Sequence, residues 1–117
     1  MRSFLTAASV GMLCASTAFA ADDSTIATRF GNTVVAKGGF GEVHLYFNAD
    51  HSFTGKVMTM NYDLKGAWKV SGDNLCLTYD PVPPGITNPT CQPVAAHSIG
   101  DSWQAGDRTA TLLKGIQ

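Results

Sequence analysis

The chain has 117 residues, with eight Lys or Arg, nine Asp or Glu and a formal net charge of −1. Charges of both signs are interspersed along it, which argues against nucleic acid or an anionic membrane as the main partner, because both require clustered positive charge. Beyond the first 20 residues, the remaining 97 are enough for one domain and too few for two domains with separate cores.

Residues 1–20 have the order of a secretory signal peptide. Arg2 precedes an apolar stretch, and Ala18-Phe19-Ala20 fits the rule for signal cleavage. We therefore expect cleavage after Ala20 and a single β-rich domain of residues 21–117 in the periplasm or the extracellular space. The alternative is a lipoprotein signal at Cys14, which the bulky side chains before this cysteine disfavour. The apolar stretch is too short to span a bilayer of about 30 Å, so no transmembrane segment is expected.

From residue 33 onward, short β-prone runs alternate with Gly, Asp, Asn and Pro. This pattern predicts an all-β fold: an antiparallel meander of about seven or eight short strands that forms a small barrel, a curled sheet or a sandwich. The expected strands are residues 33–37, 42–48, 53–60, 66–70, 74–79, 92–96, 102–105 and 108–114. Residues 22–31 fit a loose leader, a short helical turn or a further edge strand.

The register of three expected hairpins follows from the requirement that apolar side chains of both strands share a face. In each hairpin one pairing achieves this: Phe47 with Phe53, Trp68 with Leu77, and Trp103 with Ala110. The two tryptophans then belong to one core. The same registers place Cys76 on the outward face and His51 at a loop position where the left-handed conformation is usual.

Two cysteines, Cys76 and Cys91, remain after removal of the signal peptide. Because an exported protein meets an oxidising compartment, we expect them to form a disulfide. The bridge closes a loop of about 15 residues, for which the chain-entropy estimate is roughly 3 kcal/mol. A metal pair or two free thiols is the alternative, but neither cysteine has a second Cys or His at ligand spacing.

Residues 80–90 contain four prolines, which cannot continue a ladder of strands. We expect a stapled surface loop, and its apolar residues form the candidate binding loop: Pro81, Val82, Pro83, Pro84 and Ile86. Exposed apolar surface of this kind commonly marks a contact site. The alternative is that the loop folds back and covers an open end of a barrel.

No residue pattern indicates catalysis. The chain has neither G-x-S-x-G nor H-E-x-x-H, and most of its Asp residues fall at predicted turns. We therefore expect that the protein is not an enzyme and has no catalytic residue and no cofactor. His44, Met58 and Met60 are weak candidates for a soft-metal site, because His and Met on one strand face suit copper(I). The alternative is that they are ordinary residues covering the sheet, and His51 and His97 are expected in loops.

Part of the chain resembles a known hairpin pattern. The run Phe47-Asn48-Ala49-Asp50 with Phe53, the G-x-W strand Gly66-Ala67-Trp68 and the strand Leu75-Cys76-Leu77 resemble small exported bacterial proteins of lipocalin-like or related β-meander type. The resemblance covers residues 47–77. It implies a barrel or curled sheet able to bind a small apolar ligand, and it transfers no functional residue.

These features lead to three hypotheses of function. The first is an exported, non-catalytic binding module that acts through the stapled loop, for example as an inhibitor of a secreted hydrolase. The second is a periplasmic carrier of a small ligand or soft metal, and the third is an envelope structural protein without a ligand. The partner, whether protein or small molecule, and the oligomeric state are unknown. A barrel this small is expected to be filled by its own side chains, so an open apolar cavity would favour the carrier.

Overall fold

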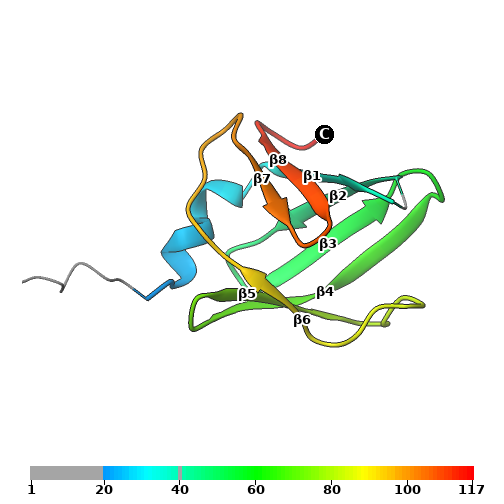
Figure 1. Ribbon diagram of the computed structural model, residues 1–117, viewed down its shortest axis with the longest axis horizontal. Coiled ribbons are helices and arrows are strands. Elements are labelled where there is room, and N and C mark those ends of the chain that lie inside the picture. The colour runs from blue at the N-terminus through cyan, green and yellow to red at the C-terminus, as the bar shows by residue number, and fades with distance from the viewer. Residues whose placement is uncertain (1–19, 40) are drawn as a thin grey trace, which may run out of the picture.

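The computed structural model describes residues 20–39 and 41–117, and the strands of this part form one antiparallel sheet that curls into a nearly closed barrel (Figure 1). The strands are β1 (Thr33–Gly38), β2 (Gly41–Phe47), β3 (Ser52–Val57), β4 (Tyr62–Ser71), β5 (Asn74–Tyr79), β6 (Thr90–Pro93), β7 (Ser102–Ala105) and β8 (Arg108–Leu113). The predicted all-β fold is confirmed. Residues 1–19 of the predicted signal peptide lie outside the described residues.

The strand order is β6-β5-β4-β3-β2-β1-β8-β7. Strands β1 to β6 therefore form a meander, after which the chain crosses one end of the barrel and returns as β7 and β8. Strand β8 pairs with β1, with Ala110 opposite Ala36. This pairing of distant segments curls the sheet and leaves β6 and β7 as its two edges. The side chain of Gln92 in β6 approaches the turn that follows β7, because a Cβ built on Gly106 would lie 3.1 Å from Nε2 of Gln92.

The three predicted hairpin registers are confirmed. Phe47 pairs with Phe53, Trp68 with Leu77, and Trp103 with Ala110. Strand bounds differ from the predicted ones by more than one residue in three strands, since β3 ends at Val57, β4 begins at Tyr62 and β6 covers Thr90–Pro93. The early start of β4 reflects continued pairing with β3 through Asp63 and Leu64. The chain leaves β6 after Pro93, where the N–H of Val94 donates to the backbone oxygen of Asp73.

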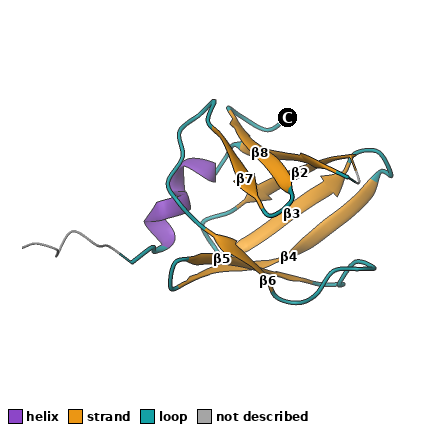
Figure 2. Ribbon diagram, in the orientation of Figure 1, coloured by secondary structure: helices purple, strands orange, loops and turns teal. Residues whose placement is uncertain are grey.

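The ambiguous segment before β1 is a short 3₁₀ helix, η2 (Asp23–Arg29), preceded by a capping box (Figure 2). The Asp22 carboxylate accepts a hydrogen bond from the N–H of Ser24, and Thr25 Oγ1 accepts one from the N–H of Asp22. These contacts satisfy amide groups that a helix start otherwise leaves unpaired. The helix buries Ile26 completely, and it thereby adds an apolar side chain to the core of the barrel.

The two ends of the barrel are built differently. Helix η2 and the turns that follow β2, β4 and β6 lie at one end, which we call the closed end. The turns that follow β1, β3 and β7 lie at the other, the open end, together with the proline-rich loop of residues 80–89 (Figure 1). The core side chains also differ in size between the two ends. Large side chains fill the closed half: Ile26, Phe47, Phe53, Trp68 and Leu112.

The G-x-W strand shows why the barrel closes tightly at this half. A Cβ on Gly66 would lie 2.0 Å from the backbone oxygen of Thr78 and 2.9 Å from the ring of Phe53. Only glycine fits such an approach. Two positions along the strand, Trp68 is 2 % exposed and its indole N–H donates to the backbone oxygen of Asn48 at 2.8 Å. Gly66 thus lets β5 and the Phe53 ring approach β4 closely, and Trp68 fills the adjacent part of the core.

The disulfide Cys76–Cys91 joins directly opposed residues of β5 and β6. Leu75 and Leu77 belong to the main core cluster, whereas Cys76 between them is buried at 6 % exposure but faces the other side of the strand, outside that cluster. The bridge therefore lies on the outer side of the sheet, as the register predicted, and it fixes the short edge strand β6 and the base of the loop of residues 80–89.

We expect replacement of both cysteines by serine to lower the free energy of unfolding by roughly 3 kcal/mol, because the bridge restricts a loop of about 15 residues in the unfolded chain. Urea unfolding of the oxidised wild type and the Cys76→Ser, Cys91→Ser variant measures the difference. Titration of free thiols in the native protein provides the control, and reactive thiols in it would contradict the predicted bridge.

We expect Gly66→Ala to destabilise the fold by about 1–3 kcal/mol, because the added methyl must displace the backbone of β5. Gly39→Ala is the matched control, since a Cβ at Gly39 meets no described atom within 4 Å. Thermal unfolding of the two variants tests the close approach of β4 and β5. Equal melting temperatures would show that the barrel does not require glycine at position 66.

Candidate functional site

A cavity of about 490 Å³ occupies the open half of the barrel. Most of its wall on β1 to β4 is formed by inward-facing apolar side chains: Ala36, Val43, Leu45, Val57 and Leu64. These residues are smaller on average than those of the closed half, so they pack into a second apolar cluster that lines the cavity without filling it. The expectation that a barrel of this size is filled by its own side chains is wrong for this half.

The proline-rich loop forms one side of this cavity. Pro83, Pro84 and Ile86 line the wall, whereas Val82 is 48 % exposed. Pro81 lines a second, more polar pocket of about 720 Å³ together with Tyr46 and Lys56. Three of the five candidate binding residues therefore cover the open end of the barrel, which agrees with the second of the two arrangements considered for this loop.

The loop is fastened at its base by hydrogen bonds as well as by the disulfide. The side chain of Asn88 accepts a bond from the N–H of Tyr79 at 2.9 Å and donates to its backbone oxygen at 2.7 Å. The N–H of Ile86 also donates to the backbone oxygen of Pro83. Because Asn88 satisfies both backbone groups of Tyr79 as a strand partner would, it holds the loop against the end of β5.

Three polar side chains interrupt the apolar wall. They are Tyr62, Tyr79 and Arg108, each half-buried. Burial raises the pKa of the Tyr79 phenol, and the nearby positive charge of Arg108 acts in the opposite direction. Tyr79 is therefore a neutral hydroxyl at physiological pH, able to donate and accept a hydrogen bond. Its ring meets that of Phe53 edge to face at 5.3 Å, which joins the cavity to the packed core.

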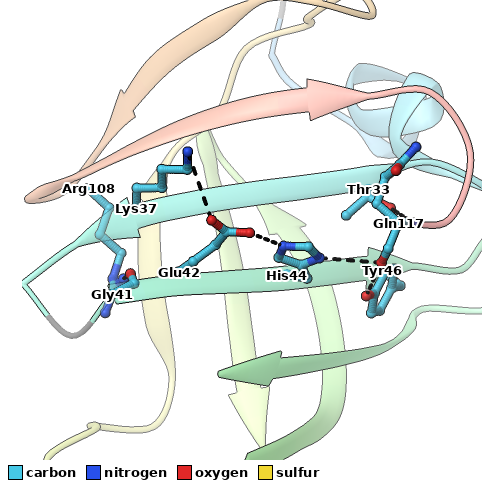
Figure 3. Close-up of polar contacts among 8 residues, drawn as sticks. All are labelled: Thr33, Lys37, Gly41, Glu42, His44, Tyr46, Arg108 and Gln117. Atoms are coloured by element: carbon cyan, nitrogen blue, oxygen red, sulfur yellow. Dashed lines mark hydrogen bonds and ion pairs between the residues drawn. The ribbon is translucent and has the colours of Figure 1, made fainter. Parts of the chain in front are cut away.

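Arg108 faces inward because residues alternate along β8. Ala110 and Leu112 belong to the core, and Arg108 occupies the next position of the same face. Gly38 makes room for it, since a Cβ there would lie 2.8 Å from Cγ of Arg108. The guanidinium donates to the backbone oxygen of Gly41 at 3.3 Å (Figure 3). This contact holds the guanidinium at the open end.

The sequence interpretation missed Arg108 and Tyr79, although it contained a signal for the arginine. The predicted pairing of Trp103 with Ala110 places Ala110 in the core. Period-two alternation then puts Arg108 on the same inward face. A basic residue on an otherwise apolar face was the feature to follow.

His44 lies outside the barrel, on the outer face of β2, and is 7 % exposed. Its Nε2 is 2.5 Å from Oε2 of Glu42, and its Nδ1 is 3.3 Å from the backbone oxygen of Gln117 (Figure 3). The hydrogen bond with His44 holds the pKa of the Glu42 carboxyl below its ordinary value. Gln117 also accepts from the hydroxyl of Tyr46. These contacts fasten the last described residue over the outer face of the sheet.

The longer predicted strand implied that Met58 and Met60 share a strand face with His44. This prediction is wrong. Strand β3 ends at Val57, so Met58 and Met60 lie in the turn before β4, where they are 43 % and 62 % exposed. Met60 lines the mouth of the cavity. Within residues 20–39 and 41–117, no three His, Cys, Asp or Glu side chains gather as a metal-binding group.

The other two histidines stack on the two tryptophans at the closed end. His51, with φ of 74°, lies 4.2 Å from the Trp68 ring and contacts Asp23 of η2 at 2.6 Å. The predicted left-handed conformation is confirmed. His97 stacks on Trp103 at 3.7 Å, and Arg29 lies on the same indole at 5.1 Å.

Arg29 joins the helix to the segment that crosses the closed end. It is 4 % exposed and donates to the backbone oxygen of Ala95 at 3.2 Å. Burial lowers its pKa to about 10, so it remains charged at neutral pH. Thr28 adds a second link by donating to the backbone oxygen of His97. The closed end is therefore a polar and aromatic seal.

The lining of the cavity is mostly apolar, and its volume falls within the range of about 300–1,000 Å³ that is typical of small-ligand sites. None of the described helices is both long and apolar enough to cross a membrane. Searches against protein-family models, curated proteins and solved structures give no match to this chain. The function must therefore be inferred from the geometry of the barrel and its cavity.

We expect the free energy of unfolding to fall as pH decreases from about 7 to about 5, with part of this loss due to His97. Burial, followed by the charge of Arg29, lowers the pKa of His97 from 6.5, while Asp101 acts in the opposite direction. Below its ordinary pKa, the unfolded state therefore binds more protons at this residue, and the folded state loses relative stability.

His97→Phe should lose less stability over the same pH range, because it keeps a ring on Trp103 and removes the titrating group. Urea unfolding at several pH values measures the difference. The wild type and the variant should differ in the slope of stability against pH. Parallel curves would contradict the assignment to His97.

Proposed function

We propose that this protein is an exported, non-catalytic carrier that binds a small apolar molecule in the open half of its barrel. The observation that carries the proposal is the apolar cavity of about 490 Å³, roofed by Pro83, Pro84 and Ile86. A loop that inhibits a hydrolase would need to project its apolar residues into a partner. Here Pro83, Pro84 and Ile86 line the cavity, whereas Pro81 and Val82 do not, and the lining by these three residues favours ligand binding over inhibition.

The rigidity of the site also supports the proposal. The disulfide and Asn88 fix the ends of the roof. Helix η2 and the stacked pairs His51–Trp68 and His97–Trp103 close the opposite end of the barrel. A site that is held open before binding spends less free energy on ordering its own residues. The disulfide is consistent with an oxidising compartment, and export through the predicted signal peptide would place the protein there.

A neutral fluorescent probe, N-phenyl-1-naphthylamine, tests binding directly, because its emission rises in apolar surroundings. We expect saturable binding by the wild type. Ala36→Phe should weaken binding about tenfold or more, equivalent to about 1.4 kcal/mol, since the added ring occupies the cavity that Ala36 lines.

Ala67→Phe is the matched control, because Ala67 is exposed on the outer side of β4. It should bind the probe as the wild type does. Thermal unfolding confirms that both variants are folded. No saturable binding by folded wild type would refute the proposal, and so would equal weakening by the two variants.

A further inference from the structure

We infer that the natural ligand is amphipathic, with an apolar body inside the barrel and a carboxylate held by Arg108 at the open end. The inference rests on the proposed function, since it requires the cavity to be the binding site. It goes further by assigning the chemical class of the ligand and the residue that recognises its polar group.

The position of Arg108 in the wall is the first argument. Arg108 carries a charge at neutral pH. None of the described residues that line the cavity is acidic. The wall therefore presents a positive charge beside apolar surface that includes Ala36, Val43 and Val57. A neutral hydrocarbon gains nothing from this charge, whereas an anionic group is attracted to it.

The local structure around Arg108 provides the second argument. The missing side chain of Gly38 makes room for Arg108 on the inward face of the barrel, and the backbone oxygen of Gly41 accepts a hydrogen bond from its guanidinium. A planar guanidinium presents five donors as a fork, so one arginine can hold a backbone carbonyl and a carboxylate at the same time.

Tyr79 supplies the third argument. Its phenol belongs to the same wall, close enough to Arg108 for the arginine charge to act on its pKa. A neutral hydroxyl beside a guanidinium is a second donor for an oxyanion. The apolar residues of the roof, Pro83 and Ile86, then cover the part of the ligand next to its head group.

Three probes with one chain length and different head groups test the sign of the charge without any mutation. Decanoic acid, 1-decanol and decylamine compete with N-phenyl-1-naphthylamine for the wild type at neutral pH. We expect decanoate to compete at least about tenfold better than decylammonium, because the carboxylate can accept charge-assisted hydrogen bonds from Arg108 and the ammonium cannot. Equal or better competition by the amine would overturn the inference.

Variants then assign the effect to the arginine. Arg108→Met keeps the apolar stem and should weaken decanoate binding about tenfold while leaving 1-decanol within about twofold. Arg108→Lys keeps the charge without the fork and should fall between the two. Tyr79→Phe should weaken decanoate alone. Decanoate binding that is unchanged in folded Arg108→Met would overturn the assignment.

The outcomes separate this inference from the proposed function. Saturable probe binding with no preference for decanoate leaves the carrier proposal standing and overturns the carboxylate site. Failure of the neutral probe and all three decyl compounds to bind folded wild type overturns both. A preference for decanoate that depends on Arg108 supports both.

Discussion

The size of the inward-facing side chains is the constraint on which the rest of the structure depends. At the closed end, Trp68, Phe53 and Ile26 occupy the space between the strands, and Gly66 lets β4 approach β5 closely enough to hold them. At the open end, the same alternation presents Ala36, Val43 and Val57, which pack into a second, smaller apolar cluster and leave a cavity beside it. One curled sheet thus contains a packed half that stabilises the fold and an unfilled half available to a ligand. The disulfide and Asn88 keep the roof over the second half.

Much of the fold could be predicted because its hairpins are local. The register of β2 with β3 follows from the apolar residues on either side of a three-residue loop, and it needs no knowledge of the remaining chain. The pairing of β1 with β8 is different. It joins Ala36 to Ala110, and no turn or spacing in the sequence specifies which distant strand completes the barrel. The strand bounds near Met58 and Gly66 were misjudged for a related reason, since pairing partners decide where a ladder ends.

The candidate site was predictable only in part. Prolines at residues 80–89 indicate a rigid loop, and Cys76 and Cys91 indicate its staple, but neither shows which way the apolar residues face. The cavity depends on the combined volume of side chains from several strands and the loop, which no local pattern reports. Arg108 was overlooked because attention to histidines and methionines followed residue chemistry, whereas its importance lies in which side of β8 it occupies. The metal hypothesis at His44 depended on extending β3 to Met60, beyond its actual end.

The edges of the sheet have a consequence for how the protein behaves among copies of itself. An uncovered strand edge is a template on which another chain can add a strand, and long flat edges promote polymerisation. Both edges here, β6 and β7, are only four residues long. They face one another across the line where the barrel fails to close, β6 ends in Pro93, and Gln92 stands beside Gly106 in the intervening space. A strand from another molecule could therefore form few hydrogen bonds with either edge. The barrel is in this way protected against edge-to-edge aggregation although β6 and β7 do not pair.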